Sequence, residues 1–487
     1  MEPMNLRFGG GAADTFLSPV FAIALVVAFI LILCLPRKYA IAPLIFTVFT
    51  IPIGQVVVLG GLHFTVMRIL ILAGLSRLAI SGRAQKGGVF AGGFNWIDRI
   101  FALFAVLQFI AFSLEWMQMQ ASIRAMGGLL DTLGGYCVVR FLIRDREDVR
   151  RATKMFAVVA VVLGACMIGE QITHKNIFWL WSGTGGEVAE RASKFRSRGS
   201  FEVYLTAGAF GATLLPLFVW LWSDVRSRVM AGLGMAGATA MTLTCVSSSP
   251  VLAYIAGIMA LCFWPFRKRM RLLRWGFVFT LIALQLVMKA PVWALIGRAN
   301  VFSASSGYHR YMLVDNFIRH FGDWWLFGFK DFDKWGWDMW DLSNQFVAYG
   351  LTGGLVTLAS FIALLSLSFA GLGRARKLVA RNRGEAWFFW CLGAALFAHV
   401  VAFFGMSYFD QMQFAFYSLL AIISVSVSRA RRQPVRKLAS VREVWAAEPE
   451  ACLIPEPQVA SRAVDAAHGR EPALQKSSLP LSRILFR

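Results

Sequence analysis

Residues 307–329, GYHRYMLVDNFIRHFGDWWLFGF, crowd charged and aromatic side chains between two long apolar stretches. Placed on a helix at about 100° per residue, the run 310–321 separates into an apolar and a polar arc, which predicts an amphipathic helix at a membrane surface. Arg310 lies on the apolar side, where a guanidinium has to snorkel to water or find an anion. Since the guanidinium fork matches a phosphate through two parallel N–H bonds, Arg310 and Arg319 are predicted to bind a diphosphate, with a snorkelling or structural arginine as the alternative. The apolar arc comprises Leu313, Val314, Phe317, Ile318 and Phe321, and the polar arc Asp315, Asn316 and Arg319.

A second group of cations occurs in KFRSRGSFEVYLTAG, residues 194–208. Arg196 and Arg198 directly precede Gly199, Ser200 and an apolar stretch that is long enough for a helix. Helix N-termini present free N–H groups and a positive dipole end, so two arginines at this place predict a second anion site. Together the two groups predict one pocket for a lipid diphosphate.

Tryptophans and aspartates alternate in the segment 324–346, which holds five tryptophans. Their location favours an aromatic belt at the membrane interface, and the alternative is that Trp335, Trp337 and Trp340 stack on sugar rings. A carboxylate beside apolar rings tends to have a raised pKa, which suits a general base. The spacing of the aspartates does not fit a calcium loop, and no metal site is predicted.

These residues must be positioned by membrane helices, because 57% of the 487 residues are hydrophobic and only 16% are charged. Apolar runs of about 18–22 residues recur along the chain, and this is the length that a helix needs to cross a bilayer. The predicted fold is therefore an all-α polytopic transmembrane bundle of about 12–13 spans, with a large extracytoplasmic loop that contains short amphipathic helices. The expected spans are 17–35, 40–60, 63–80, 95–113, 124–143, 155–172, 201–222, 229–246, 250–265, 275–290, 346–370, 387–405 and 412–428.

The net charge of +22 is explained by basic residues in short loops on one side of the expected spans, as the positive-inside rule predicts. Nucleic-acid binding is not expected, because no recognition module accompanies the charge. The predicted organisation is a membrane domain over 1–428, with outer loops at 173–200 and 291–345, and a disordered, basic and proline-rich cytoplasmic tail over 429–487.

Ionisable residues inside the expected spans are functional candidates by default, with a structural role as the alternative. Asp131, Glu170 and Lys289 belong to this group. Arg140 lies nine residues after Asp131, about 13.5 Å along a helix, so the two are not expected to pair. Arg140 is expected to snorkel to the inner surface instead.

Several motifs over 124–370 resemble the bacterial O-antigen polymerase and O-antigen ligase family. FRSRGSF resembles the family's Arg-x-x-Gly-x-Phe stretch, with Arg196 at the arginine. HRYMLVDNFIRHFGDWWLFGF resembles its arginine-led helix, and SNQFVAYGLTGGLV its asparagine-led entry to a glycine-rich span. Two further stretches, GGLLDTLGGYCVVRFLIRDREDVRRATK and LTCVSSSPVLAY, resemble a span with its cytoplasmic turn and a Leu-Thr-x-Ser-Arg turn.

The chain departs from the family pattern at two places. Serines 247–249 occupy the region of the family's turn arginine, and Asp341 and Ser343 stand where the family has a histidine before its asparagine. The resemblance therefore leaves two candidates for the catalytic base, Asp341 and His309.

The resemblance implies a metal-independent membrane glycosyltransferase in the bacterial cytoplasmic (inner) membrane. The donor would be a glycan on undecaprenyl diphosphate, and the acceptor a second lipid-linked glycan (polymerase) or a lipid-core sugar (ligase), in exopolysaccharide, O-antigen or lipopolysaccharide assembly. It implies no cofactor, and it implies membrane lipids and other polysaccharide-assembly proteins as partners. A transporter or flippase and a non-catalytic membrane assembly protein are the alternatives.

Overall fold

The computed structural model describes residues 15–81, 88–183, 188–191, 194–298, 305–336 and 338–446. The chain divides into two units, Met1–Val435 and Arg436–Arg487, and the first holds the helix bundle. The described part is mostly helical, and seven of its helices are long and apolar enough to cross a membrane. These are α4 (Trp96–Trp116), α7 (Arg146–Thr173), α9 (Tyr204–Trp222), α12 (Met270–Val287), α16 (Gln345–Leu378), α17 (Arg383–Phe403) and the apolar part of α18 (Asp410–Ala446).

The other expected spans fall on shorter or interrupted helices, so the expected count of about thirteen is not reached by helices of full spanning length. Five of them have 14 to 17 residues: α1 (Pro19–Cys34), α2 (Arg37–Thr50), α3 (Val66–Ser81), α10 (Arg228–Thr244) and α11 (Ser248–Cys262). The sixth is α5 (Met119–Leu129), a π-helical turn at Leu130–Gly134 and α6 (Gly135–Leu142), which follow one another without leaving helical backbone geometry. Membrane helices shorter than the bilayer are tolerated by local thinning.

Two small hairpins and several short helices lie between these elements. Strand β1 (Val56–Leu59) pairs antiparallel with β2 (Leu62–Thr65), and β3 (Ala189–Arg191) pairs with β4 (Lys194–Arg196), with Ala189 opposite Arg196. The short helices are α8 (Ile177–Ser182), α13 (Leu295–Arg298), α14 (Ser305–Arg319) and α15 (Phe321–Trp324). Residues 433–446, which the sequence assigned to the unstructured tail, continue α18, and 447–487 lie outside the described residues.

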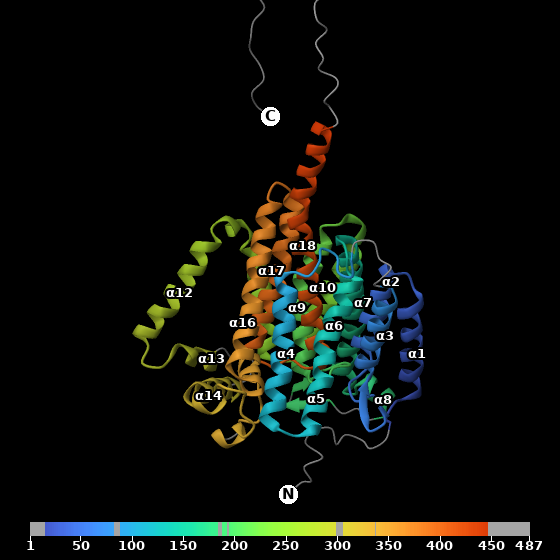
Figure 1. Ribbon diagram of the computed structural model, residues 1–487. Coiled ribbons are helices and arrows are strands. Elements are labelled where there is room, and N and C mark those ends of the chain that lie inside the picture. The colour runs from blue at the N-terminus through green and yellow to red at the C-terminus, as the bar shows by residue number, and fades with distance from the viewer. Residues whose placement is uncertain are drawn as a thin grey trace, which may run out of the picture. The chain divides into compact units, whose positions relative to one another are not determined.

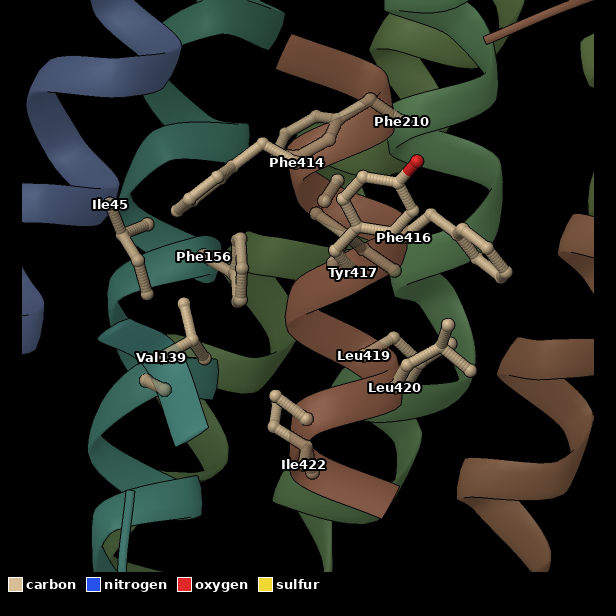
Figure 2. Close-up of a cluster of buried hydrophobic side chains, with 14 of the residues drawn as sticks. Ile45, Val139, Phe156, Phe210, Phe414, Phe416, Tyr417, Leu419, Leu420 and Ile422 are labelled. Atoms are coloured by element: carbon tan, nitrogen blue, oxygen red, sulfur yellow. The ribbon is translucent and has the colours of Figure 1, made fainter. Parts of the chain in front are cut away.

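Helices α9 and α18 form the centre of the bundle, because both are buried along most of their length. Figure 2 shows aromatic side chains of α7, α9 and α18 packed together, among them Phe156, Phe210 and Phe414. Phe210 stacks on Phe49 of α2 with ring centroids 4.5 Å apart. Lipid tails are as apolar as these side chains, so there is no hydrophobic driving force between helices within the membrane. The packing therefore depends on close shape complementarity.

Glycines bring the backbones of α7 and α10 into contact. A methyl group added at Gly237 of α10 would lie 2.3 Å from the carbonyl oxygen of Ala160, and one at Gly164 of α7 would lie 2.8 Å from that of Gly237. Small residues at a crossing allow this approach, which agrees with the packing role expected for small-residue runs in membrane helices.

The connections that the sequence assigned to the inner face meet at one end of the bundle, which we call the basic end. Ionic and hydrogen-bonded contacts join them there: Arg37 with Asp148 at 2.8 Å, Arg146 with Glu385, Arg150 with Asp224 at 3.4 Å, and Arg376 with the carbonyl oxygen of Arg267 at 2.8 Å. The opposite end carries α5, α8, α13 and α14 (Figure 1).

Arg140 does not snorkel as predicted. Its side chain is fully buried and forms an ion pair with Asp98 at 3.2 Å, and it donates to the carbonyl oxygens of Ala91 and Gly93. Asp98 also accepts hydrogen bonds from Tyr136 and Ser424. The snorkelling prediction was wrong because a counter-ion 42 residues earlier in the chain, on α4, meets Arg140 inside the bundle.

Helix α12 differs from the other long helices, because none of its residues is buried. In Figure 1 it slants away from α16.

Candidate functional site

The loop that carries Arg196 and Arg198 is fixed by hydrogen bonds from three helices. The Glu170 carboxylate of α7 accepts from the backbone N–H groups of Arg198 (3.2 Å) and Gly199 (3.0 Å). The Asn176 amide donates to the carbonyl oxygen of Gly199 at 2.8 Å, and the Ser200 hydroxyl donates to that of Phe49 at 2.5 Å. Glu170, a functional candidate by sequence, thus anchors the loop. The backbone that carries Arg196 and Arg198 is therefore held in one conformation.

Arg196 is buried, with only 7% of its surface exposed. One Nη donates to the Tyr204 hydroxyl at 2.6 Å, and the guanidinium lies 4.7 Å from the centroid of that ring. Its Nε has no hydrogen-bond partner among the described residues, and no ion pair within the described ranges involves it. A buried cation without a counter-ion is costly, so the arrangement favours an anionic ligand at this position.

Arg198 contacts a different aromatic ring. Its guanidinium lies 4.1 Å from the centroid of Trp179, and one Nη donates to the carbonyl oxygen of Glu202 at 3.4 Å. The arginines were predicted to precede a helix N-terminus directly, but α9 begins at Tyr204. The residues between form the fixed loop instead.

The turn between α10 and α11 lies beside the Arg196 loop, since the backbone N–H of Ser197 donates to the carbonyl oxygen of Thr244 at 3.1 Å. Val246 in this turn has φ of 44°, a strained conformation for a β-branched residue, and strain of this kind clusters at functional sites. Serines 247–249, which replace the family's arginine region, are buried there.

The segment 305–345 brings Arg310, His309 and Asp341 together. His309 Nε2 lies 3.0 Å from the carbonyl oxygen of Asp341. Arg310 is buried, with 6% exposed, and lies close enough to Asp341 to influence its ionisation. Burial raises the pKa of the Asp341 carboxyl, and His309 and Arg310 oppose this shift, whereas Asp338 adds to it. Asp341 also keeps contact with solvent, so we expect a smaller rise in its pKa than full burial would cause.

The amphipathic pattern predicted for 310–321 is reversed at several positions of α14 and at the start of α15. Asp315 and Asn316, assigned to the polar arc, are buried, whereas Ile318 and Phe321, assigned to the apolar arc, are exposed. The reason is tertiary packing: Asp315 accepts from the indole N–H of Trp293 at 3.1 Å, and Asn316 lies against the segment that follows α15.

Arg319 lies apart from Arg310. Nine residues of α14 separate them, about 13.5 Å along the helix. Its side chain is 70% exposed and pairs with Asp315 at 2.6 Å.

The predicted stacking tryptophans differ in their surroundings. Trp335 stacks against His320, with centroids 4.6 Å apart, and against Phe329 at 5.3 Å. Trp340 is 72% exposed, which leaves its ring available to a ligand. Trp337 lies outside the described residues.

A series of contacts runs from the Arg196 loop to the Arg310 helix. The Ser249 hydroxyl of α11 donates to the carbonyl oxygen of Gly405 at 3.2 Å, and the Tyr408 N–H donates to the Gln345 side chain at the start of α16. Gln345 follows the 305–345 segment directly. Both groups of arginines therefore belong to the end of the bundle opposite the basic end.

Asp131 forms a salt bridge with Arg68 of α3 at 2.6 Å and sits in the π-helical turn. Such turns are frequent at functional sites. Sequence reasoning singled out Asp131 but missed Arg68, which a search for every basic residue within the expected spans would have found.

Lys289, a further candidate, is exposed beyond the end of α12.

Neither a family model nor a curated protein matches this chain. The resemblance to O-antigen polymerases and ligases therefore remains a prediction that rests on the motifs themselves.

Proposed function

We propose that the protein transfers a glycan from undecaprenyl diphosphate to a sugar hydroxyl on the outer face of the bacterial cytoplasmic membrane. It would act as a polymerase or ligase in exopolysaccharide or O-antigen assembly. The observation that carries the proposal is Arg196, a buried guanidinium on a rigid loop, without a counter-ion in the described part of the chain.

The diphosphate supplies the missing negative charge in this proposal. Arg196 and Arg310 are both buried, and both belong to the end of the bundle away from the basic end, where the lipid carrier would expose its head group. A buried arginine forms bidentate bonds with phosphate oxygens that are stronger than those in water. Arg198 and Arg319 are more exposed and would contribute at the rim.

The reaction exchanges one bond to the anomeric carbon for another. The acceptor hydroxyl oxygen attacks this carbon, and the bond from the carbon to the diphosphate oxygen breaks. The departing diphosphate takes the electron pair, and the arginines stabilise its growing charge. The hydroxyl proton passes to the base, Asp341 or His309, and such a transfer contributes typically about 10²–10⁴-fold to the rate. Trp340 would align the sugar.

The test compares two variants of strand β4 that remove the same charge. Arg196→Ala is expected to abolish glycan lengthening, since it removes the buried cation, whereas Lys194→Ala, which removes an exposed cation two residues away, is expected to leave it unchanged. Arg310→Ala should behave like Arg196→Ala. Chain length is measured on gels of extracted glycan, with protein abundance in membranes as the control. Normal glycan length in both arginine variants would remove the proposed site.

A deletion strain separates the alternative functions. Loss of high-mass exopolysaccharide would indicate a polymerase, and uncapped lipid core with accumulated lipid-linked polymer would indicate a ligase. An unaltered glycan profile combined with defective solute uptake would contradict the proposal and favour a transporter.

A further inference from the structure

A cavity of about 300 Å³ opens at the basic end of the bundle, between the start of α4, the C-terminal part of α16 and the middle of α18. It is distinct from the candidate site, since it lies at the other end of the same helices. Helix α4 packs along α16 (Figure 1). The wall of the cavity begins with the segment Gly92–Ile97 and is completed by the two long helices.

Four arginines line this cavity: Arg99, Arg374, Arg431 and Arg432. All four side chains are exposed, and none forms an ion pair with a described residue. None of the described lining residues is acidic. The nearest carboxylate in sequence, Asp98, is fully buried and already paired with Arg140, so it does not neutralise the cavity.

The start of α4 adds to this positive potential. Asn95 caps the helix, and its amide donates to the hydroxyl groups of Ser424 (2.8 Å) and Ser428 (2.7 Å), which fixes α4 against α18. The N-terminal end of a helix carries a partial positive charge that favours anions. The arginines of α4, α16 and α18 therefore line one cavity, and hydrogen bonds hold α4 against α18 there.

The remaining walls are apolar. Leu367, Gly371 and Val427 lie on the membrane side of the arginines, as Leu367 precedes Arg374 on α16 by seven residues, about 10 Å along the helix. Trp96 is 64% exposed at the rim, and Arg99 lies 5.0 Å from the centroid of its ring. Exposed tryptophans at this level are typical of the membrane–water interface.

We infer that this cavity binds the head group of an anionic phospholipid, with the phosphate among the four arginines and the start of the acyl chains against Leu367 and Val427. One part of the cavity is cationic and another part is apolar, and an amphiphilic ligand can contact both. A free anion would use only the cationic part. Basic pockets between membrane helices bind anionic lipid head groups on these grounds.

The test uses the full-length protein, purified in detergent and depleted of lipid. Phosphatidylglycerol or phosphatidylcholine is added back, and bound lipid is counted by native mass spectrometry. The wild type is expected to retain phosphatidylglycerol and not phosphatidylcholine. The variant R99Q/R374Q/R431Q/R432Q is expected to bind phosphatidylglycerol at least roughly tenfold more weakly, since each arginine near an anionic lipid contributes to binding.

The matched control, R226Q/R228Q/R269Q/R271Q, removes the same charge from exposed arginines of the basic end outside the cavity, and it is expected to bind as the wild type does. Equal loss in both variants would show attraction to net charge alone and overturn the proposal. Inorganic phosphate that displaces the lipid and raises the melting temperature as much as the lipid does would identify a soluble anion instead. If the fourfold variant shows no melting transition, it has not folded, and the single variant R374Q is measured instead. Unchanged lipid binding by R374Q would also contradict the site.

Discussion

The surroundings of Asp341 alter the ionisation of its carboxyl group. Burial raises its pKa above the usual value of about 3.9, and His309 and Arg310 limit that rise. A base must be deprotonated, so if Asp341 takes the acceptor proton, transfer activity should decline as the pH falls through this raised pKa. The activity of membranes that contain the protein, measured on a lipid-linked donor between about pH 4 and 8, is the readout.

Two variants distinguish the candidate bases. Asp341→Asn should lose activity at every pH if the carboxylate is the base. An active Asp341→Asn variant that loses its activity on the further change His309→Gln would assign the proton transfer to His309.

Single residues also show what local sequence can and cannot predict. Arg196 and Arg310 stand out because each is a cation beside apolar sequence, and both are buried. The partner of Arg140 was not predictable in this way, because Asp98 lies on another helix and their meeting depends on how α4 packs against α6. Ion pairs between residues of different helices cannot be predicted from the local sequence pattern.

For the helices and strands, too, the local sequence predicts some features and not others. The apolar runs predict helical structure at each expected span, since hydrophobic length is a local property, but the helices α7, α16 and α18 extend eight or more residues beyond their expected bounds. Their lengths differ from expectation where β1 and β2 or the π-helical turn interrupt the run. The faces of α14 were predicted from its own period, but Trp293 and the segment after α15 cover its polar side, and this covering is set by distant residues.

The contact between α7 and α10 gives a test at this scale. Gly237→Ala is expected to destabilise the protein by about 1–3 kcal/mol, since the new methyl group would collide with the backbone of Ala160. Gly169→Ala is the control on α7, because nothing lies within 4 Å of its added methyl group. Alanine favours a helix by up to about 1 kcal/mol over glycine, so the control should be neutral or stabilising.

Thermal unfolding of both variants in detergent measures the difference. Equal melting temperatures for Gly237→Ala and the wild type would mean that the two backbones do not approach this closely in the folded protein.

The helix bundle of the first unit has one basic end and one end with the candidate site, and this difference predicts its orientation in the membrane. Positive loops are retained in the cytoplasm, so the turn between α16 and α17 is expected inside and the 305–345 segment outside. An alkaline phosphatase fusion after Asp333 should therefore be active, and one after Arg381 inactive, with a fluorescent protein fusion giving the opposite pattern. Activity of the phosphatase at both positions would contradict the orientation.

If the proposed function holds, helix α12 has a consequence for how the lipid-linked donor enters and leaves the protein. Every residue of α12 is at least partly exposed, so acyl chains would surround it and fill the space toward α16. In chain order it is followed by α13 and then by α14, which carries Arg310. A polyprenyl tail could then slide sideways from the bilayer past α12 while its head group stays at the water boundary, and the tightly packed helices around α9 and α18 would have no need to separate at each turnover.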